Sequence, residues 1–279
     1  MSDILLPHRP TVAPAMPQQV QATDGLAKLT RPSLITRFFM AVVAKAERLN
    51  LAFARHGNPP VYDASVFPWA EAVARAAPAM RQELQRVLQR KSELPNFHDI
   101  ASDVKAISDD ENWKTYFLLA FGERSERNIA ACPQTWAAVS QIPGLKTAMF
   151  SIFEPGKHLK PHRGPYNGVL RLHVGLIVPE LSERLAIRVH DRICHWQEGQ
   201  ALIFDDAYEH EAWNHTGRTR VVLFCDFVKP LGFPANLVNW LLLNLALFTP
   251  FIREGLDKHK QWEQRFYAEA EALRNRKPH

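Results

Sequence analysis

Hydrophobic and polar positions divide the chain into a helical first half and a strand-rich second half. Residues 34–55 (LITRFFMAVVAKAERLNLAFAR) carry an apolar stripe at helical spacing, which four arginines and lysines interrupt. This pattern fits either a helix packed on the domain or a basic amphipathic helix lying on a membrane. Residues 66–93 repeat the helical spacing, and Pro78 predicts a break because proline removes a helical hydrogen bond. The aromatic and apolar residues of 109–121 predict the first strand of a sheet.

The periodicity changes at Gly144, where short runs of β-branched and aromatic residues begin to follow one another between turn residues. Six such runs are present: TAMFSIF, GVLRLHVGLIV, LAIRVH, ALIFDD, HEAWN and TRVVLFCDFV. Many short strands at this spacing are typical of an all-β sandwich or barrel. No period of about 20 to 50 residues repeats, which excludes solenoids and propellers. We therefore expect a mainly β core with α flanks, in which helices precede and follow the barrel.

Charged and imidazole side chains fall on one face of two of these strands. Alternation along 169–175 places Arg171 and His173 on one face and the apolar residues between them on the other. The same alternation along 219–228 groups four further residues: Arg220, Val222, Phe224 and Asp226. Because a buried charge is costly unless it is paired, we expect the barrel interior to hold an anion.

The segment 231–252 belongs to a run of 23 residues without a charge, which ends at Arg253. Pro234 and Pro250 bracket only about 15 helical residues, too few for a comfortable bilayer crossing, and asparagines interrupt them. Such a helix is buried in the protein or in a dimer contact, or it rests in a membrane interface. The basic residues that follow suit anionic headgroups, and the tail to residue 279 has the composition of a charged helix.

These patterns predict four parts of the chain. Residues 1–30 form a disordered, proline-rich tail, which lacks the basic and apolar stretches of a secretory signal. Residues 31–140 form a helical lead-in with the first strand or strands of the sheet. Residues 141–230 form the β core, and residues 231–279 form apolar and then charged C-terminal helices.

Amino-acid composition excludes several classes of protein but does not identify the function. Hydrophobic residues make up 46% of the chain and charged residues 23%, which excludes a wholly disordered or collagen-like protein. Three cysteines without a CxxC spacing argue against a disulfide scaffold or a zinc knuckle and suit a reducing compartment. The net charge of +5 is too small to indicate nucleic acid, but it suits an acidic small molecule or an anionic membrane surface. We expect a cytoplasmic or membrane-peripheral protein with no nucleic-acid partner.

Two of the 12 histidines stand beside predicted strands in polar turns. His162 lies in KPHRGP and His210 in DDAYEHEAW. Histidines at the mouths of separate barrel strands can face each other across one interior, an arrangement that suits non-haem iron. Spacing alone does not select this pair, because any two of 12 histidines would supply one.

The residues around both histidines resemble a known family. Residues 150–176 (FSIFEPGKHLKPHRGPYNGVLRLHVGL) and 196–230 (WQEGQALIFDDAYEHEAWNHTGRTRVVLFCDFVKP) closely resemble the aspartyl/asparaginyl β-hydroxylases. The resemblance covers about a third of the chain strongly and rests on PHxGP, LRxHxGL, FDDxxEH and an arginine ten positions after its histidine. It implies a double-stranded β-helix fold, of the jelly-roll or cupin-like kind. It also implies an iron(II)- and 2-oxoglutarate-dependent dioxygenase that uses O2.

The resemblance also implies the metal ligands. His162 and His210 match the two iron-ligating histidines of the family. The usual acidic third ligand is missing, because His-x-Asp becomes His162-Arg163-Gly164, a departure that the animal enzymes share. Asp206 is a candidate to orient His210 from behind, although a turn would use the same residue type.

Four further residues match the positions that bind the cosubstrate. Arg220 matches the arginine that pairs with the distal carboxylate of 2-oxoglutarate, and Ser151 matches a serine that helps it. His173 matches a histidine near the metal-bound end of the cosubstrate, and Arg171 matches an arginine that lines the cofactor and substrate side. The chemistry agrees, because an arginine fork suits a carboxylate and neutral imidazoles suit iron.

The expected reaction is hydroxylation of an unactivated C–H bond, coupled to decarboxylation of 2-oxoglutarate to succinate. The pattern HRxPYxGxLRxHxGL and the helical lead-in resemble the bacterial lipid A hydroxylase-like branch, which favours an acyl chain of lipid A or a related lipid. Gly164 favours the branch that hydroxylates the β-carbon of Asp or Asn, free or in a peptide. A non-catalytic, cupin-like binding protein is the third alternative.

Overall fold

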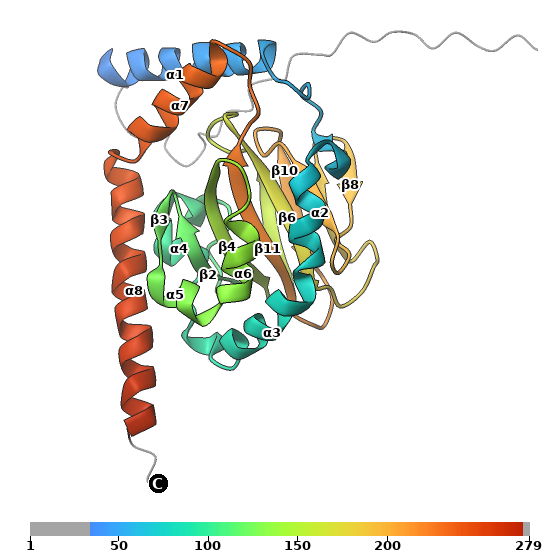
Figure 1. The fold of residues 1–279 in the computed structure, drawn as a ribbon, viewed down its shortest axis with the longest axis vertical. Helices are drawn as coiled ribbons and strands as arrows, with labels where there is room; N and C mark the ends of the chain where they lie inside the picture. Colours follow the sequence, from blue (N-terminus) through green and yellow to red (C-terminus); the bar gives the residue numbers. More distant parts are fainter. Residues whose placement is uncertain (1–33, 276–279) are drawn as a thin grey trace, which may run out of the picture. The chain divides into compact units, whose positions relative to one another are not determined.

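The computed structural model describes residues 34–275, and the tail predicted for 1–30 lies outside the described residues. The strands form two antiparallel sheets (Figure 1). The larger sheet has the order β1-β9-β6-β11-β4-β2-β3 and the smaller one the order β5-β10-β7-β8. The larger sheet consists of β1 (Val61–Tyr62), β2 (Trp113–Ala120), β3 (Glu123–Arg124), β4 (Leu145–Phe153), β6 (Val169–Ile177), β9 (Ala201–Phe204) and β11 (Arg220–Val228). The smaller sheet consists of β5 (Lys157–His162), β7 (Leu185–Val189), β8 (Arg192–Cys194) and β10 (His210–Asn214).

Two cores lie on opposite faces of the larger sheet. Leu170, Leu172 and Val174 of β6 pack with the helices on one face. Phe204 and Val222 on the other face pack with apolar residues of the smaller sheet, so this core fills the space between the two sheets. Paired antiparallel sheets around such a core make the double-stranded β-helix, and the predicted fold class is confirmed.

Each of the six predicted runs contains a strand, and the aromatic run at 109–121 contains β2. The alternation predicted for β6 and β11 is confirmed, because Arg171, His173, Arg220 and Phe224 line the interior while the residues between them face the helices. Strands β1, β3, β5 and β8 were not expected, and β1 precedes the run at 109–121 that was predicted to hold the first strand. In β5 a buried lysine, Lys157, breaks the apolar pattern. The Lys157 ammonium is paired with Asp110 at 2.9 Å, which makes its burial tolerable.

The helices flank the sheets (Figure 1). They are α1 (Leu34–Ala52), α2 (Pro68–Arg75), α3 (Ala77–Leu88), α4 (Phe97–Ile100), α5 (Glu126–Ala131), α6 (Pro133–Val139), α7 (Ala235–Ala246) and α8 (Pro250–Asn275), with short 3-10 turns at Ala64–Val66, Lys91–Glu93 and Ser102–Ala106. The break expected near Pro78 is present, since α2 ends at Arg75 and Pro78 stands in the first turn of α3. Proline is tolerated there because its missing N–H would have no helical partner. Within residues 34–275, no helix combines the length and hydrophobicity needed to cross a membrane.

Candidate active site

His162 and His210 lie directly opposite each other on the paired strands β5 and β10. Their ring centroids are 4.2 Å apart. Nδ1 of His162 bonds the Lys160 carbonyl oxygen at 2.7 Å, and Nδ1 of His210 bonds the Tyr208 carbonyl oxygen at 2.9 Å. A carbonyl only accepts, so both Nδ1 atoms carry the proton and both Nε2 atoms keep a free lone pair. The structure therefore brings together two preoriented imidazole donors.

Burial keeps both rings neutral. Desolvation lowers the pKa of His162 to about 4. Desolvation also lowers the pKa of His210 well below its usual value, and the neighbouring His162 and Arg171 lower it further. Neutral imidazole is the form that binds iron or zinc, so the pair is ready to bind a metal at neutral pH. The described residues hold no group of three His, Cys, Asp or Glu side chains that could bind a metal.

Arg220 is a buried cation without a carboxylate partner among the described residues. Its side chain is 1% exposed, and its guanidinium lies 3.8 Å over the Phe153 ring and 4.2 Å over the Trp196 ring. Its only hydrogen bond within the described part of the chain runs from Nη1 to the Ser151 carbonyl oxygen at 3.3 Å, and Nε has no partner. Desolvation lowers the Arg220 pKa to about 9. A carboxylate ligand would satisfy this charge.

His173 and Ser151 complete the polar wall near Arg220. The Trp196 indole donates to Nδ1 of His173 at 3.1 Å. Burial, together with Arg220 and Arg171, lowers the His173 pKa well below its usual value, so the ring is neutral. Because Nδ1 accepts from the indole, the ring proton is on Nε2, which has no partner among the described residues. The Trp113 indole donates to Oγ of Ser151 at 3.0 Å, which leaves the serine hydroxyl hydrogen available. Two donors therefore stand beside the Arg220 cation.

Arg171 lines the same interior, but protein carboxylates neutralise it. Nη2 lies 2.9 Å from Oδ2 of Asp206, and Nε lies 2.8 Å from Oδ1 of Asp226. The anion expected beside Arg171 is thus supplied by the chain itself. Burial raises the Asp206 pKa to about 7 against the lowering effect of Arg171, and Asp226 and Asp205 raise it further. Asp206 contacts the site through Arg171, whereas the expected orienting bond to Nδ1 of His210 is made by Tyr208.

Gly164 and Asp206 share the position of the missing acidic ligand. The Gly164 N–H donates to the Asp206 carbonyl oxygen at 2.7 Å. A Cβ atom at position 164 would lie only 2.4 Å from Oδ2 of Asp206. The Asp206 carboxylate therefore occupies the space that a side chain at 164 would need, so this backbone requires glycine there.

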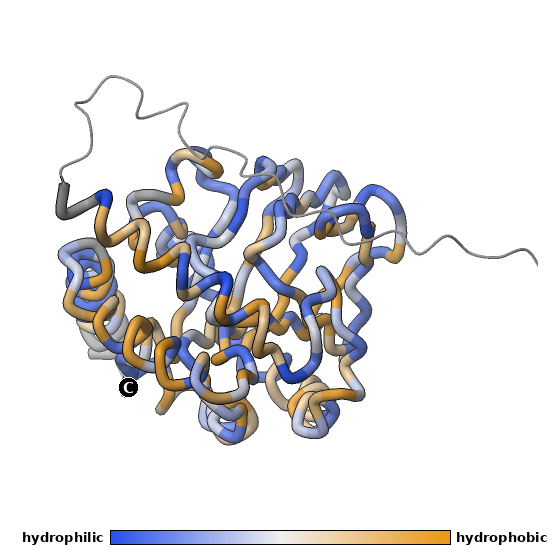
Figure 2. Tube along the Cα trace, turned by 90° about the horizontal axis from the view of Figure 1, so that it is seen from above, coloured by the Kyte–Doolittle hydropathy of each residue, from blue (hydrophilic) through white to orange (hydrophobic). Residues whose placement is uncertain are grey.

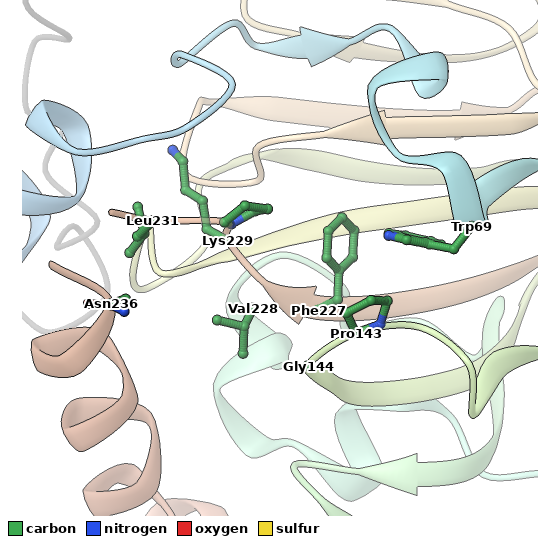
Figure 3. Close-up of a pocket in the computed structure, with 9 residues that line it drawn as sticks. Trp69, Pro143, Gly144, Phe227, Val228, Lys229, Leu231 and Asn236 are labelled. Atoms are coloured by element: carbon green, nitrogen blue, oxygen red, sulfur yellow. The ribbon is translucent and has the colours of Figure 1, made fainter. Parts of the chain in front are cut away.

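A cavity of about 30 Å³ lies among these groups, and six of the seven predicted site residues line it. The seventh, Asp206, lies behind Arg171. Sequence reasoning missed Trp113 and Trp196, which orient Ser151 and His173, because isolated tryptophans form no pattern. A larger cavity of about 350 Å³ lies beside Phe227 and Trp69 (Figure 3). Phe227 belongs to the face of β11 that meets the helices, so the sheet separates this cavity from the histidines.

A family model for aspartyl/asparaginyl β-hydroxylase matches residues 74–230, which span both histidines and Arg220. The chain belongs to this family. It is 69% identical over 260 residues to the ornithine lipid ester-linked acyl 2-hydroxylase of Rhizobium tropici. That match covers 93% of this chain and 92% of the relative.

A second relative is human aspartyl/asparaginyl β-hydroxylase, 33% identical over 163 residues. That match covers 53% of this chain and only 21% of the human protein. Among solved structures, a prolyl-4-hydroxylase of Pseudomonas putida matches 55% of this chain and 88% of its own, with 18% identity and a TM-score of 0.35. The family and its hydroxylase activity thus rest on the sequence relatives.

Proposed function

We propose that the chain is an iron(II)- and 2-oxoglutarate-dependent hydroxylase that oxidises C2 of the ester-linked acyl chain of an ornithine lipid. The observation that carries this proposal is the 69% identity to the R. tropici enzyme over nearly the full length of both chains. Such a lipid falls within the class that the sequence favoured, an acyl chain of lipid A or a related lipid.

The residues present fit the implied metal and cosubstrate. Nε2 of His162 and Nε2 of His210 would hold iron(II), and bound iron would supply the oxygen activation that no side chain provides. Arg220 would bind the distal carboxylate of 2-oxoglutarate, with Ser151 beside it. His173 would donate from Nε2 to a cosubstrate oxygen, because this buried N–H lacks a partner. The cavity of about 30 Å³ holds little more than a water, so cosubstrate entry requires lining side chains to move.

The chain's own groups would also shape the reaction. Each turnover would consume O2 and 2-oxoglutarate and release succinate, CO2 and the hydroxylated acyl chain. The Asp206 carboxylate occupies the space that an acidic side chain at position 164 would need, and its Oδ1 has no hydrogen-bond partner among the described residues. The apolar side chains between the sheets would exclude bulk water from the reacting carbon.

The direct test is hydroxylation of purified ornithine lipid with iron(II), ascorbate and 2-oxoglutarate. Mass spectrometry should find one added oxygen, and mild alkaline hydrolysis should release it as a 2-hydroxy fatty acid. The His210→Ala and Arg220→Ala variants should yield no product. The His158→Ala variant should stay active, since this exposed ring lies on the same strand β5 outside the cavity. Oxygen on an Asp-containing peptide and not on the lipid would move the substrate to the Asp/Asn class. No succinate with either substrate would favour a binding protein.

Metal content gives a separate readout. Equilibrium dialysis against iron(II) under anaerobic conditions should load the wild type and the His158→Ala variant. The His162→Ala and His210→Ala variants should lose bound iron, because a single imidazole cannot hold it. Full iron occupancy in the His210→Ala protein would contradict the ligand assignment.

A further inference from the structure

Exposed apolar side chains gather on one face of the described chain. Fourteen large apolar residues are exposed among the described residues, and eleven of them lie within 38–53 or 233–248. Isolated exposed apolar residues are ordinary, but such a concentration is typical of an interaction surface. The remaining three are Val66, Leu181 and Ile193. Helices α1 and α7 contact each other and carry most of this face (Figures 1 and 2). Figure 2 looks onto it and shows hydrophobic positions along both helices.

Helix α7 leaves much of its apolar surface exposed. Leu237, Trp240, Leu241 and Leu245 follow helical spacing and are 49–60% exposed. The inner side carries Asn239, which is fully buried and donates to the Gly168 carbonyl oxygen at 2.9 Å. A helix buried in the core would not expose these four large apolar side chains. The sequence alternative of burial in the core of this chain is therefore wrong for α7.

The charges around this face are mainly positive. Residues 34–55 and 230–253 contain five arginines and lysines and one acidic residue, Glu47. Arg37, Lys45 and Arg48 of α1 are exposed. In a two-fold dimer through this face, the cations of both copies would be brought together and would repel each other. An anionic lipid surface instead attracts them, while tryptophan and leucine enter the headgroup boundary.

The polar side of the same helices holds the loop that follows His162. Glu47 of α1 pairs with Arg163 at 3.0 Å. The Asn50 side-chain amide donates to Oδ1 of Asn167 at 2.9 Å and to the Tyr166 hydroxyl at 3.0 Å. With Asn239 on Gly168, both helices are thus bonded to the segment 163–168, which begins one residue after a metal-site histidine. A surface bound by α1 and α7 would lie close to the candidate active site.

We propose that α1 and α7 form a docking face for anionic lipid bilayers, and that it presents the 163–168 loop and the adjoining site to the membrane. The face is defined by its exposed apolar residues: Phe38, Phe39, Met40, Leu51, Phe53, Phe233, Leu237, Trp240, Leu241, Leu245 and Phe248. This inference rests on the proposed function in one respect, because a membrane lipid as substrate would explain why the apolar face is exposed to solvent. Docking on the bilayer brings the enzyme to acyl chains that water does not dissolve.

Flotation tests the docking itself. Vesicles of phosphatidylcholine with an equimolar share of phosphatidylglycerol should carry wild-type protein upward, more weakly at high salt. The Leu241→Asp, Leu245→Asp variant should lose vesicle binding about tenfold or more, because two apolar side chains no longer enter the interface. The matched control is Leu181→Asp, Ile193→Asp, whose residues are somewhat more exposed but lie elsewhere. This control should float like the wild type.

Three results would overturn the proposal. In flotation, the wild-type protein could fail to bind vesicles, or the control variant could lose binding as strongly as the docking variant. In sedimentation, the wild type could be a dimer that the Leu241→Asp, Leu245→Asp variant no longer forms. Urea unfolding shows whether each variant is folded; the single change Trp240→Ala replaces the pair if it is not. Hydroxylation of detergent-solubilised lipid separates docking from function. The docking variant should keep this turnover and lose turnover on vesicles. A chain that floats yet hydroxylates neither form would refute the proposed function alone.

Discussion

Arg171 and Arg220 enter the same barrel interior from the paired strands β6 and β11, yet their surroundings differ. Two carboxylates hold Arg171, whereas aromatic rings and one carbonyl surround Arg220. Arg220 is fully buried and Arg171 is mostly buried, and a buried charge without a partner is costly. The neutralised arginine is thus part of the architecture, and the other is left for a ligand. Residue type alone would not separate the two roles.

The comparison predicts opposite effects of removing each charge on stability. Arg171→Met leaves the buried Asp206 and the partly exposed Asp226 without their cation, and should lower the free energy of unfolding by about 3–5 kcal/mol. Arg220→Met leaves no carboxylate unpaired, so it should be nearly neutral or stabilising. Urea denaturation of both metal-free variants measures the difference. Equal losses would mean that the two arginines play the same structural part.

For 2-oxoglutarate affinity, in contrast to stability, the Arg220 substitution should have the larger effect. Arg220→Met should weaken 2-oxoglutarate binding by about 2–5 kcal/mol, since the distal carboxylate loses its charged partner. Arg220→Lys should recover only part of the affinity, because an ammonium cannot make the two-pronged contact. Calorimetry with the metal-loaded protein measures both. An unchanged affinity in Arg220→Met would place the anion site elsewhere in the chain.

Sequence predicted most of the longer strands, because alternation is local information. It missed the short strands β1, β3 and β8, and it missed β5, whose Lys157 depends on Asp110, 47 residues away. The same limit applies to the site. Motifs identified His162, His210 and Arg220, but the contact between Gly164 and Asp206 depends on packing between distant segments. The apolar character of α7 was evident in the sequence, whereas its exposure was not.

A substitution at Gly164 tests the packing of Asp206, the carboxylate that pairs with Arg171. Gly164→Ala places a methyl group against the Asp206 carboxylate, and should destabilise the protein by about 1–3 kcal/mol. Gly217→Ala is the control, because a Cβ there meets nothing within 4 Å. In an Asp206→Ala background, the Gly164→Ala change should cost much less, since the colliding atoms are gone. Additive losses in this double-mutant cycle would show that the two residues do not compete for space.

The smallest effect tests whether every unpartnered buried group marks a ligand. His259 in α8 is 5% exposed, and neither ring nitrogen has a hydrogen-bond partner in the described part of the chain. Its ring packs against Phe117 and Trp262 outside the cavity. Burial lowers its pKa to about 4, so the unfolded chain binds a proton between about pH 6.5 and 4 that the folded protein does not. This histidine therefore reduces stability as the pH falls through that range. His259→Leu should stabilise the protein by about 1 kcal/mol near neutral pH, and by more at pH 5. Urea unfolding at the two pH values measures this gain in stability. The 2-oxoglutarate affinity of the variant should be unchanged, unlike that of the Arg220 variants. Weaker cosubstrate binding would instead link α8 to the site.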